Sequence, residues 1–588
     1  MKKYLYILSF CFLQCALTGF AQNKHTPISD TINLSEVTAL AERPFVQHKA
    51  DRMIVSVEHS KLLKARSLSN ILNLIPGVNY DGEGGITFMG NGIKIYENGK
   101  LVRLSGAQLK SYLSSLRGND IKNLELLPQA TAGYDAEGGT AVLVINRQKK
   151  HEYGLSGYVG SEYERKSKNL FSEFAGGTYS WGNVALYANM ALGQSASHSK
   201  ISESDYGQNI TINSISETTD KSLYYMPKLG FDFYISPKHY LGVEWSGNYS
   251  KDYANACWVH STITDNSPYQ TSIRSYAPYT LKPNTNNVTL NYEWKTDTLG
   301  SKLNLIADYV GEREYDLYEY ENKYTQGIGG DSIISKSQSS FEYVNICSAQ
   351  VDFTKFFNRH QFTLGTKYIN ANIHYDNKLY LGNTTLGGML SEDVDQWDDF
   401  CYVERRYAIY GMYRYSSRPW DFQVGLRDEY TEWNTQQRVR TQLHNNQKGN
   451  NIFPSFFVRK GMGQGNALSL SYTQSINRPS YQIVNPFVFH LSETSYKEGN
   501  PNLKGELLYN TALQFVLKSR SVFSLSALFI DRKINEVYEQ MNERQTRYTL
   551  RNDGKLKKLA LYIEFPFTCG LWNSRSNVEL SENFYRNS

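Results

Sequence analysis

From Gly154 to the end of the chain, apolar and polar residues alternate in short segments separated by polar or glycine-containing turns. The alternation is clear over residues 184–192, 229–235 and 288–294, and it recurs around residues 349–368. Successive side chains of a β-strand point to opposite faces, so a period of two predicts strands with one apolar face. We therefore expect this region to be mainly β, with about 16–18 strands.

The connections between these segments are of two kinds, short turns such as residues 236–239 and long polar stretches such as 196–221 and 376–399. Strands that cross a membrane must be apolar toward lipid and polar toward the lumen, and they must close so that no backbone group is left unpaired. The pattern predicts a transmembrane antiparallel β-barrel with short turns toward the periplasm and long loops outside.

A secreted sandwich, propeller or surface adhesin is the competing all-β interpretation. The barrel is favoured for two reasons. A propeller would show a repeat of about 40–50 residues, and the chain has no such repeat. Tyr and Trp also recur at strand ends, where the girdles of a barrel place amphipathic rings.

Residues 45–150 follow a different pattern and predict a small α+β domain. Ser67 can cap a helix whose apolar positions 68, 71, 72 and 75 share one face. A second helix is expected to begin at Ser105, with Gln108 at the spacing of a capping box. Two helices of this kind can cover one face of a sheet.

The sheet of this domain is predicted from three further segments. Asn98-Gly99 lies between two apolar runs, and this pair readily adopts the φ > 0 angles of a tight hairpin. Residues 121–127 and 141–146 are expected to add two strands. The domain can therefore form a core of its own.

The first 22 residues indicate export. Lys2-Lys3 precedes an apolar run that is too short to span a membrane, and Gly19 and Ala21 are small residues before a cleavage site. Removal of this signal peptide also removes Cys11 and Cys15. The remaining cysteines are too few and too widely spaced for a disulfide framework, and their pairing stays open. They are Cys257, Cys347, Cys401 and Cys569.

Composition and motifs exclude several functions. The 588 residues include 45 Tyr, 27 Phe and 8 Trp, only 20% are charged, and the mean hydropathy is −0.50. A helical membrane protein is less polar than this and a disordered chain is less aromatic. The net charge of +5 is not gathered into a block, so nucleic acid is not expected. The sequence contains no catalytic motif, no cofactor motif and no spacing typical of metal ligands. We therefore expect that the protein is not an enzyme.

Several motifs occur in an order that resembles the TonB-dependent outer-membrane receptors, and within them the outer-membrane β-barrel subgroup. Residues 71–78 (ILNLIPGV) and 134–139 (YDAEGG) are similar to parts of that family's plug domain. Residues 424–429 (VGLRDE), 477–487 and 499–504 (GNPNLK) are similar to parts of its barrel.

The resemblance implies a plug domain over residues 45–150, held in the lumen of a barrel over residues 151–588. It also implies an outer-membrane location, contact with outer-membrane lipid, an external ligand and the periplasmic partner TonB, which pulls on an N-terminal segment. Residues 23–44 form the leader that would carry this segment, which must be extended and β-prone. The best candidate is Leu34, Ser35, Glu36, Val37, Thr38 and Ala39. The other interpretation of these residues is an ordinary linker or a first plug strand.

The same resemblance implies that Arg478-Pro479 marks a strand leaving the membrane into a long loop, residues 481–505. Aromatic rings there could line a ligand entrance, or they could pack the loop against the plug. The candidate ligand contacts are Tyr481, Phe487, Phe489 and Tyr496. A surface lipoprotein is a further partner that the family implies.

The strand count departs from the family, whose barrels have 22 strands. With 16–18 strands we expect a barrel that is incomplete at its C-terminus. The leading interpretation is therefore a TonB-dependent receptor-like transporter, and two alternatives stay open. One is a non-energised outer-membrane or surface β-protein for binding or structure, and the other is a non-functional truncated receptor.

Overall fold

The computed structural model describes residues 46–587 with short gaps. The gaps are residues 65, 83, 103, 105, 138–140, 149–152, 166–168, 207–210, 265–270, 327–329, 383–390, 393–396, 439–443, 491–494, 519–520, 543–544 and 570–571. The signal peptide, the leader and the TonB-coupling candidate Leu34–Ala39 lie outside the described residues. Among the described residues, none of the helices is long and apolar enough to cross a membrane.

The plug domain is an eight-stranded sheet covered by short helices. Its strands are β1 (Val46–His48), β2 (Met53–Ser56), β3 (Val78–Tyr80), β4 (Ile86–Phe88), β5 (Asn91–Glu97), β6 (Lys100–Leu101), β7 (Ile121–Leu127) and β8 (Ala141–Arg147). Its helices are α2 (Lys61–Lys64), α3 (Leu68–Leu72), α4 (Gly106–Ser115) and the 3-10 turn η1 (Gly118–Asp120). The sheet order is β1-β2-β7-β8-β5-β4-β3, with β6 beside β5.

Several local sequence signals place elements of the plug where they were expected, and the expected cap of the second helix, Ser105, lies outside the described residues. The Ser67 hydroxyl accepts a hydrogen bond from the backbone N–H of Asn70, at 3.4 Å, and so caps α3. Asn98 and Gly99 both have positive φ, 51° and 89°, in the turn between β5 and β6. The strands predicted at 121–127 and 141–146 are β7 and β8.

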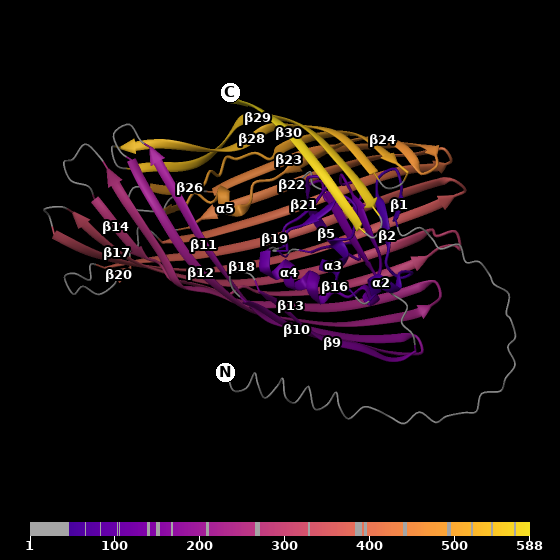
Figure 1. Ribbon diagram of the computed structural model, residues 1–588, viewed down its shortest axis with the longest axis horizontal. Coiled ribbons are helices and arrows are strands. Elements are labelled where there is room, and N and C mark those ends of the chain that lie inside the picture. The colour runs from indigo at the N-terminus through magenta and orange to yellow at the C-terminus, as the bar shows by residue number, and fades with distance from the viewer. Residues whose placement is uncertain are drawn as a thin grey trace. The chain divides into compact units, whose positions relative to one another are not determined.

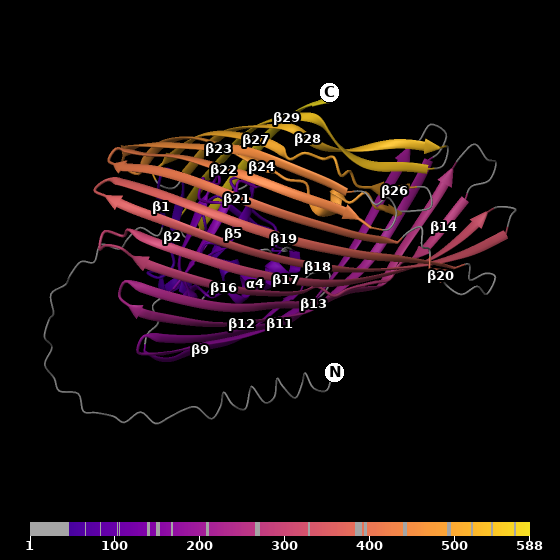
Figure 2. The same ribbon diagram turned by 180° about the vertical axis from the view of Figure 1, so that it is seen from behind.

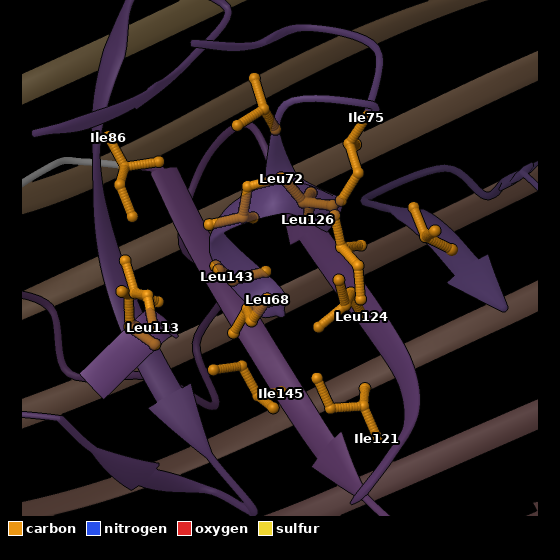
Figure 3. Close-up of a cluster of buried hydrophobic side chains, with 14 of the residues drawn as sticks. Leu68, Leu72, Ile75, Ile86, Leu113, Ile121, Leu124, Leu126, Leu143 and Ile145 are labelled. Atoms are coloured by element: carbon orange, nitrogen blue, oxygen red, sulfur yellow. The ribbon is translucent and has the colours of Figure 1, made fainter. Parts of the chain in front are cut away.

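Figure 3 shows the apolar core of the plug, in which residues of α3 and α4 meet β7 and β8. Leu68 and Leu72 on α3 are fully buried, as are Leu124 on β7 and Leu143 on β8. Burial of such side chains contributes roughly 1.5–3 kcal/mol each. The plug therefore has a core of its own, as the sequence predicts.

The second sheet forms the barrel wall around the plug (Figures 1 and 2). Its strands are β9 (Gly154–Arg165), β10 (Asn169–Trp181), β11 (Val184–Tyr206), β12 (Thr211–Ser236), β13 (His239–Thr264), β14 (Thr271–Tyr276), β15 (Tyr279–Leu281), β16 (Asn284–Lys295), β17 (Lys302–Gln326), β18 (Gly330–Phe357), β19 (His360–Gly382), β20 (Ser391–Glu392), β21 (Asp398–Ser417), β22 (Trp420–Gln437), β23 (His444–Gly463), β24 (Asn466–Asn477), β25 (Val488–His490), β26 (Ser495–Glu498), β27 (Glu506–Leu517), β28 (Ser521–Asn542), β29 (Gln545–Cys569) and β30 (Trp572–Asn587). One short helix, α5 (Tyr481–Val484), lies between β24 and β25.

Several of these 22 labelled strands are pieces of one wall strand. β14, β15 and β16 all pair with both β13 and β17, and β20 and β21 both pair with β19. β25 and β26 form a hairpin that does not interrupt the wall, because β24 pairs directly with β27; β26 adds to one edge of β29 in parallel. This leaves 17 wall strands among the described residues, which agrees with the predicted 16–18.

The wall is one continuous sheet that curves around the plug, from β9, which pairs with β10, to β30, which pairs with β29. Neighbouring wall strands are antiparallel, and because 17 is odd, β9 and β30 run in the same direction. β30 is exposed on both faces from residue 577 to residue 586.

Strand β22 shows how the wall separates lipid from lumen. Val424 and Leu426 on its outer face are 41% and 54% exposed, whereas Arg427 on its inner face is 1% exposed. Trp420 and Tyr430 bound this outer band, ten residues apart, which is about 33 Å of strand. A tilt of about 40° projects this length to about 25 Å, the height of the apolar band of a membrane barrel.

Leu426→Arg tests this orientation. In water a charge at an exposed position changes stability little, but facing lipid it should destabilise the barrel by about 2–4 kcal/mol. The midpoint of urea unfolding of the protein in detergent or vesicles measures the change.

Leu299→Arg is the matched control, because Leu299 is 69% exposed in the short connection between β16 and β17. We expect this variant to unfold like the wild type. Equal effects of the two substitutions would contradict a lipid-facing Leu426.

Candidate functional site

The loop between β7 and β8 carries the plug's main polar contact with the wall. Its residue Asp135 is 6% exposed, and its carboxylate accepts hydrogen bonds from Lys367 Nζ at 2.8 and 2.9 Å. Arg427 Nη2 lies 3.4 Å from Asp135 Oδ1, and Arg427 Nη1 donates to the carbonyl of Ala132 at 3.3 Å. A plug carboxylate is thus held by cations from β19 and β22.

A second carboxylate, Glu429 on β22, joins two wall cations to the plug. It is fully buried, and its oxygens lie 2.6 Å from Arg427 Nε and 2.7 Å from Arg478 Nη2. The backbone N–H of Ala136 donates to Glu429 at 3.4 Å. This carboxylate therefore orients both guanidinium groups and contacts the plug backbone.

Glu137 completes the contact on the plug side. Arg406 Nη1 on β21 lies 3.2 Å from its carboxylate, and Lys94 Nζ donates to its carbonyl at 2.6 Å. The plug backbone also bonds the wall directly, because Ile476 N–H of β24 donates to the carbonyl of Ala136 at 2.9 Å. We call the charged set the Asp135 cluster: Asp135, Glu137, Lys367, Arg406, Arg427, Glu429 and Arg478.

A separate set of four charges, the Glu97 cluster, joins the plug to β12 and β13. It consists of Glu97 and Arg147 from the plug with Lys228 and Glu244 from the wall. Lys228 Nζ donates to both oxygens of Glu97 at 3.1 and 3.0 Å. Each cation of this cluster lies between the two carboxylates, so both plug charges have partners on the wall.

A third contact lies near the start of the plug. Arg414 on β21 donates to Asp51 at 3.2 Å and to Asp421 at 2.7 Å. Asp421 also accepts from the backbone N–H of Ala50 at 3.1 Å. The plug is thus fixed to the wall by charged groups at three separate places.

The clusters keep the plug carboxylates ionised. Burial by itself raises the pKa of Asp135, but Lys367 and Arg427 outweigh it and hold that pKa well below its ordinary value. Burial also opposes ionisation of Glu97, and Lys228 and Arg147 lower its pKa to about 2. Both carboxylates therefore carry their charge at neutral pH.

Buried ion pairs specify geometry more than they add stability. Their desolvation costs about as much as their attraction returns, but loss of one partner leaves a buried charge uncompensated. The clusters therefore set the position of the plug, and each depends on all of its members. A site of this kind holds a domain in place.

The predicted ligand residues lie in the segment between β24 and β27. Tyr481 begins α5 and donates to Glu342 on β18, and it packs beside Val484 and Leu503. Phe487 is half-buried. Phe489 and Tyr496 belong to the paired strands β25 and β26, and the side chain of Phe489 lies outside the described residues.

The wall partners of the plug were missed at the sequence level. The motif around Arg427 and Glu429 was recognised, but its ion pairs with the plug were not predicted. One signal in the sequence could have pointed to these partners, namely a charged residue at a lumen-facing position of an alternating strand. Lys228, Lys367 and Arg406 all have such a position. Which plug carboxylate each one meets depends on how the plug is placed in the barrel.

Comparison with known proteins identifies the barrel. The model of the outer membrane protein beta-barrel family matches residues 294–588, half of the chain. The chain belongs to the outer membrane protein beta-barrel family. Its location in the cell outer membrane follows from this membership. No curated protein matches the chain.

Solved structures of plug-and-barrel receptors share the fold of this family member. The copper transporter OprC has a TM-score of 0.58 at 11% identity, covering 92% of this chain and 80% of its own. The ferric enterobactin receptor PfeA from Pseudomonas aeruginosa has a TM-score of 0.55 at 14% identity, with 91% and 80% covered. The alcaligin outer-membrane receptor FauA from Bordetella pertussis has a TM-score of 0.51 at 11% identity, with 92% and 81% covered.

Glu429→Gln tests the Asp135 cluster. The substitution leaves Arg427 and Arg478 buried without their shared counter-charge, so we expect the docked plug to lose about 3–5 kcal/mol. Hydrogen exchange of the amides of residues 128–137 should accelerate accordingly. Glu432→Gln on the same strand is the control, because Glu432 pairs with the exposed Lys448. Equal exchange in the two variants would contradict the role given to Glu429.

Glu97→Gln tests the second cluster through pH. The pKa of Glu97 falls from 4.5 to about 2 on folding, so its stabilisation is complete above pH 4.5 and is lost as the pH falls through about 2. The difference in melting temperature between wild type and variant should shrink over this range. Glu203→Gln, at an exposed position of β11, should match the wild type at each pH. A difference that stays constant from pH 6 to pH 2 would contradict this assignment.

Proposed function

We propose that this protein is a TonB-dependent outer-membrane receptor that binds an external ligand and imports it by energised displacement of the plug. The observation that carries the proposal is the separation between the plug's apolar core and the wall. Among the described side chains that pack against this core, one comes from the wall, Met226 of β12, and the others belong to the plug. The main core of the plug is therefore nearly separate from the barrel, and a smaller apolar contact joins Ala136 of the plug to Phe453 and Ile476 of the wall.

The nature of the interface supports a movable plug. An interface built from apolar surface would resist separation by about 25 cal/mol for each Å² exposed. The contacts through the Asp135 and Glu97 clusters are ionic, and charges that separate in a wet lumen regain hydration. A force applied to the N-terminal side of the plug can therefore displace it as a folded unit.

TonB is the partner that would supply this force, through the leader segment Leu34–Ala39. Strand addition needs an extended segment with free backbone donors and acceptors, and the β-branched Val37 and Thr38 favour that conformation. The plug strands nearest to this segment in sequence, β1 and β2, pair with each other and then with β7. A pull on the leader would therefore reach the centre of the plug sheet.

The ligand would enter from the outer side, past the segment between β24 and β27. This segment is anchored to the inner wall, because Asn485 Nδ2 donates to the buried Asp398 at 2.7 Å. We propose Tyr481, Phe487, Phe489 and Tyr496 as ligand contacts on this segment. Glycans, peptides and metal chelates are all compatible with loops of this length.

The two alternatives from the sequence differ from this proposal in one property. A non-energised β-protein of the outer membrane, or a truncated receptor without transport, would not need TonB. Binding of TonB therefore separates the alternatives from the proposed function.

Val37→Pro tests the coupling segment. Proline removes the backbone donor that strand addition needs, so the full chain in detergent should no longer be captured by the immobilised C-terminal domain of TonB. Val37→Thr is the matched control, because it keeps the donor and the β-branched shape, and it should bind like the wild type. Equal capture of the Pro variant and the wild type would exclude this segment, and no capture of the wild type would favour the alternatives.

A further inference from the structure

Three side chains with metal-binding groups meet on the outer face of the wall, on β19 and β21. These strands are antiparallel, with His374 directly opposite Cys401 and Asp376 opposite Asp399. Neighbouring positions on one face of a strand pair differ by two residues, so His374, Cys401 and Asp399 share one face. This juxtaposition is set by the register of the sheet and does not depend on a loop.

The position of these residues relative to the membrane follows from the same register. Tyr368 and Tyr407 are opposite each other on the outer face, with ring centroids 5.0 Å apart, beside the exposed apolar residues Leu364 and Ile409. His374 and Cys401 lie six residues further along the same two strands, about 20 Å away along the strand. They therefore lie beyond the aromatic girdle, on the side of the long loops.

The distances between the three ligand atoms suit a small cation. His374 Nε2 lies 3.0 Å from Asp399 Oδ1, and the ligand atoms of all three residues lie within 4.8 Å of one another. A tetrahedral zinc ion with bonds of about 2.0–2.3 Å holds its ligand atoms about 3.3–3.8 Å apart. Small side-chain rotations would bring the three atoms to these separations.

The types of donor atom select the class of metal. Imidazole nitrogen, thiolate sulfur and carboxylate oxygen together suit borderline-soft ions, whereas magnesium and calcium prefer oxygen ligands alone. We propose that His374, Asp399 and Cys401 form a binding site for a divalent transition metal ion of the zinc type, with water in the fourth position. Because the site faces outward, this inference does not rest on the proposed transport function.

The surroundings of the three residues are compatible with such a site. The Cys401 thiol is free, and the His374 side chain is 42% exposed, so an ion can reach the site from the medium. The ring of His374 stacks on Tyr343, which restricts its rotation. Arg438 Nη1 lies 3.8 Å from Asp399 Oδ2, the carboxylate oxygen turned away from His374, and its side chain is 51% exposed and free to move into water.

Cobalt titration of the purified full chain in detergent tests the proposal. Co²⁺ replaces Zn²⁺ in such sites and reports on its ligands by absorption. We expect one equivalent of Co²⁺ to give a thiolate-to-metal charge-transfer band in the near ultraviolet and the visible bands of a four-coordinate site, and Zn²⁺ to displace it. Absence of these bands would overturn the proposal.

Matched variants assign the ligands. Cys401→Ser should abolish the charge-transfer band, and His374→Ala and Asp399→Asn should each weaken Co²⁺ binding at least about tenfold. Cys347→Ser is the control, because Cys347 is also a free thiol on a wall strand, opposite Tyr309 and Asn370. It should leave the spectrum unchanged.

Gel migration with and without boiling shows that each variant is folded. A band that persists in Cys401→Ser, or that disappears in a folded Cys347→Ser, would place the metal elsewhere and overturn the assignment. Unchanged affinity in folded His374→Ala would do the same.

Discussion

The hydrocarbon interior of a membrane offers no hydrogen-bond partner to a protein backbone, and the architecture of this protein follows from that constraint. Wall strands pair their N–H and C=O groups with those of the strands beside them, in one continuous antiparallel sheet. The outer face can then be apolar, as Val424 and Leu426 show on β22. The inner face of the same strand is left to polar residues.

The polar lumen in turn determines how the inner domain is held. Buried charges such as Arg427 and Glu429 on the wall need counter-charges, and the plug supplies Asp135 and Glu137. The plug's own apolar core does not have to extend into the wall to be stable. The plug has a core of its own and is attached to the wall through separate charged clusters. Such an attachment is compatible with displacement of the plug as a folded unit.

Much of the fold could be predicted because the relevant signals are local. The hairpin at Asn98-Gly99 and the strands β7 and β8 follow from turn chemistry and periodicity within about ten residues. The shorter pieces were not predicted, because strands such as β4 and β15 have three residues each and carry no readable period. The wall strand made of β14, β15 and β16 is held together by its pairing with β13 and β17. Because β13 and β17 are distant in sequence from each other, no local pattern predicts this strand.

The α+β domain and the β-barrel that follows it could be predicted from the sequence, because alternation and helix capping depend on residues that are close together in the chain. Which charged side chains meet is a property of the folded protein. Asp135 and Lys367 are 232 positions apart, and no local pattern pairs them. The same holds for His374 with Asp399 and Cys401, which become neighbours only through the register of β19 and β21. Contacts between distant residues depend on how strands align and how the plug is seated, and these are properties of the assembled fold.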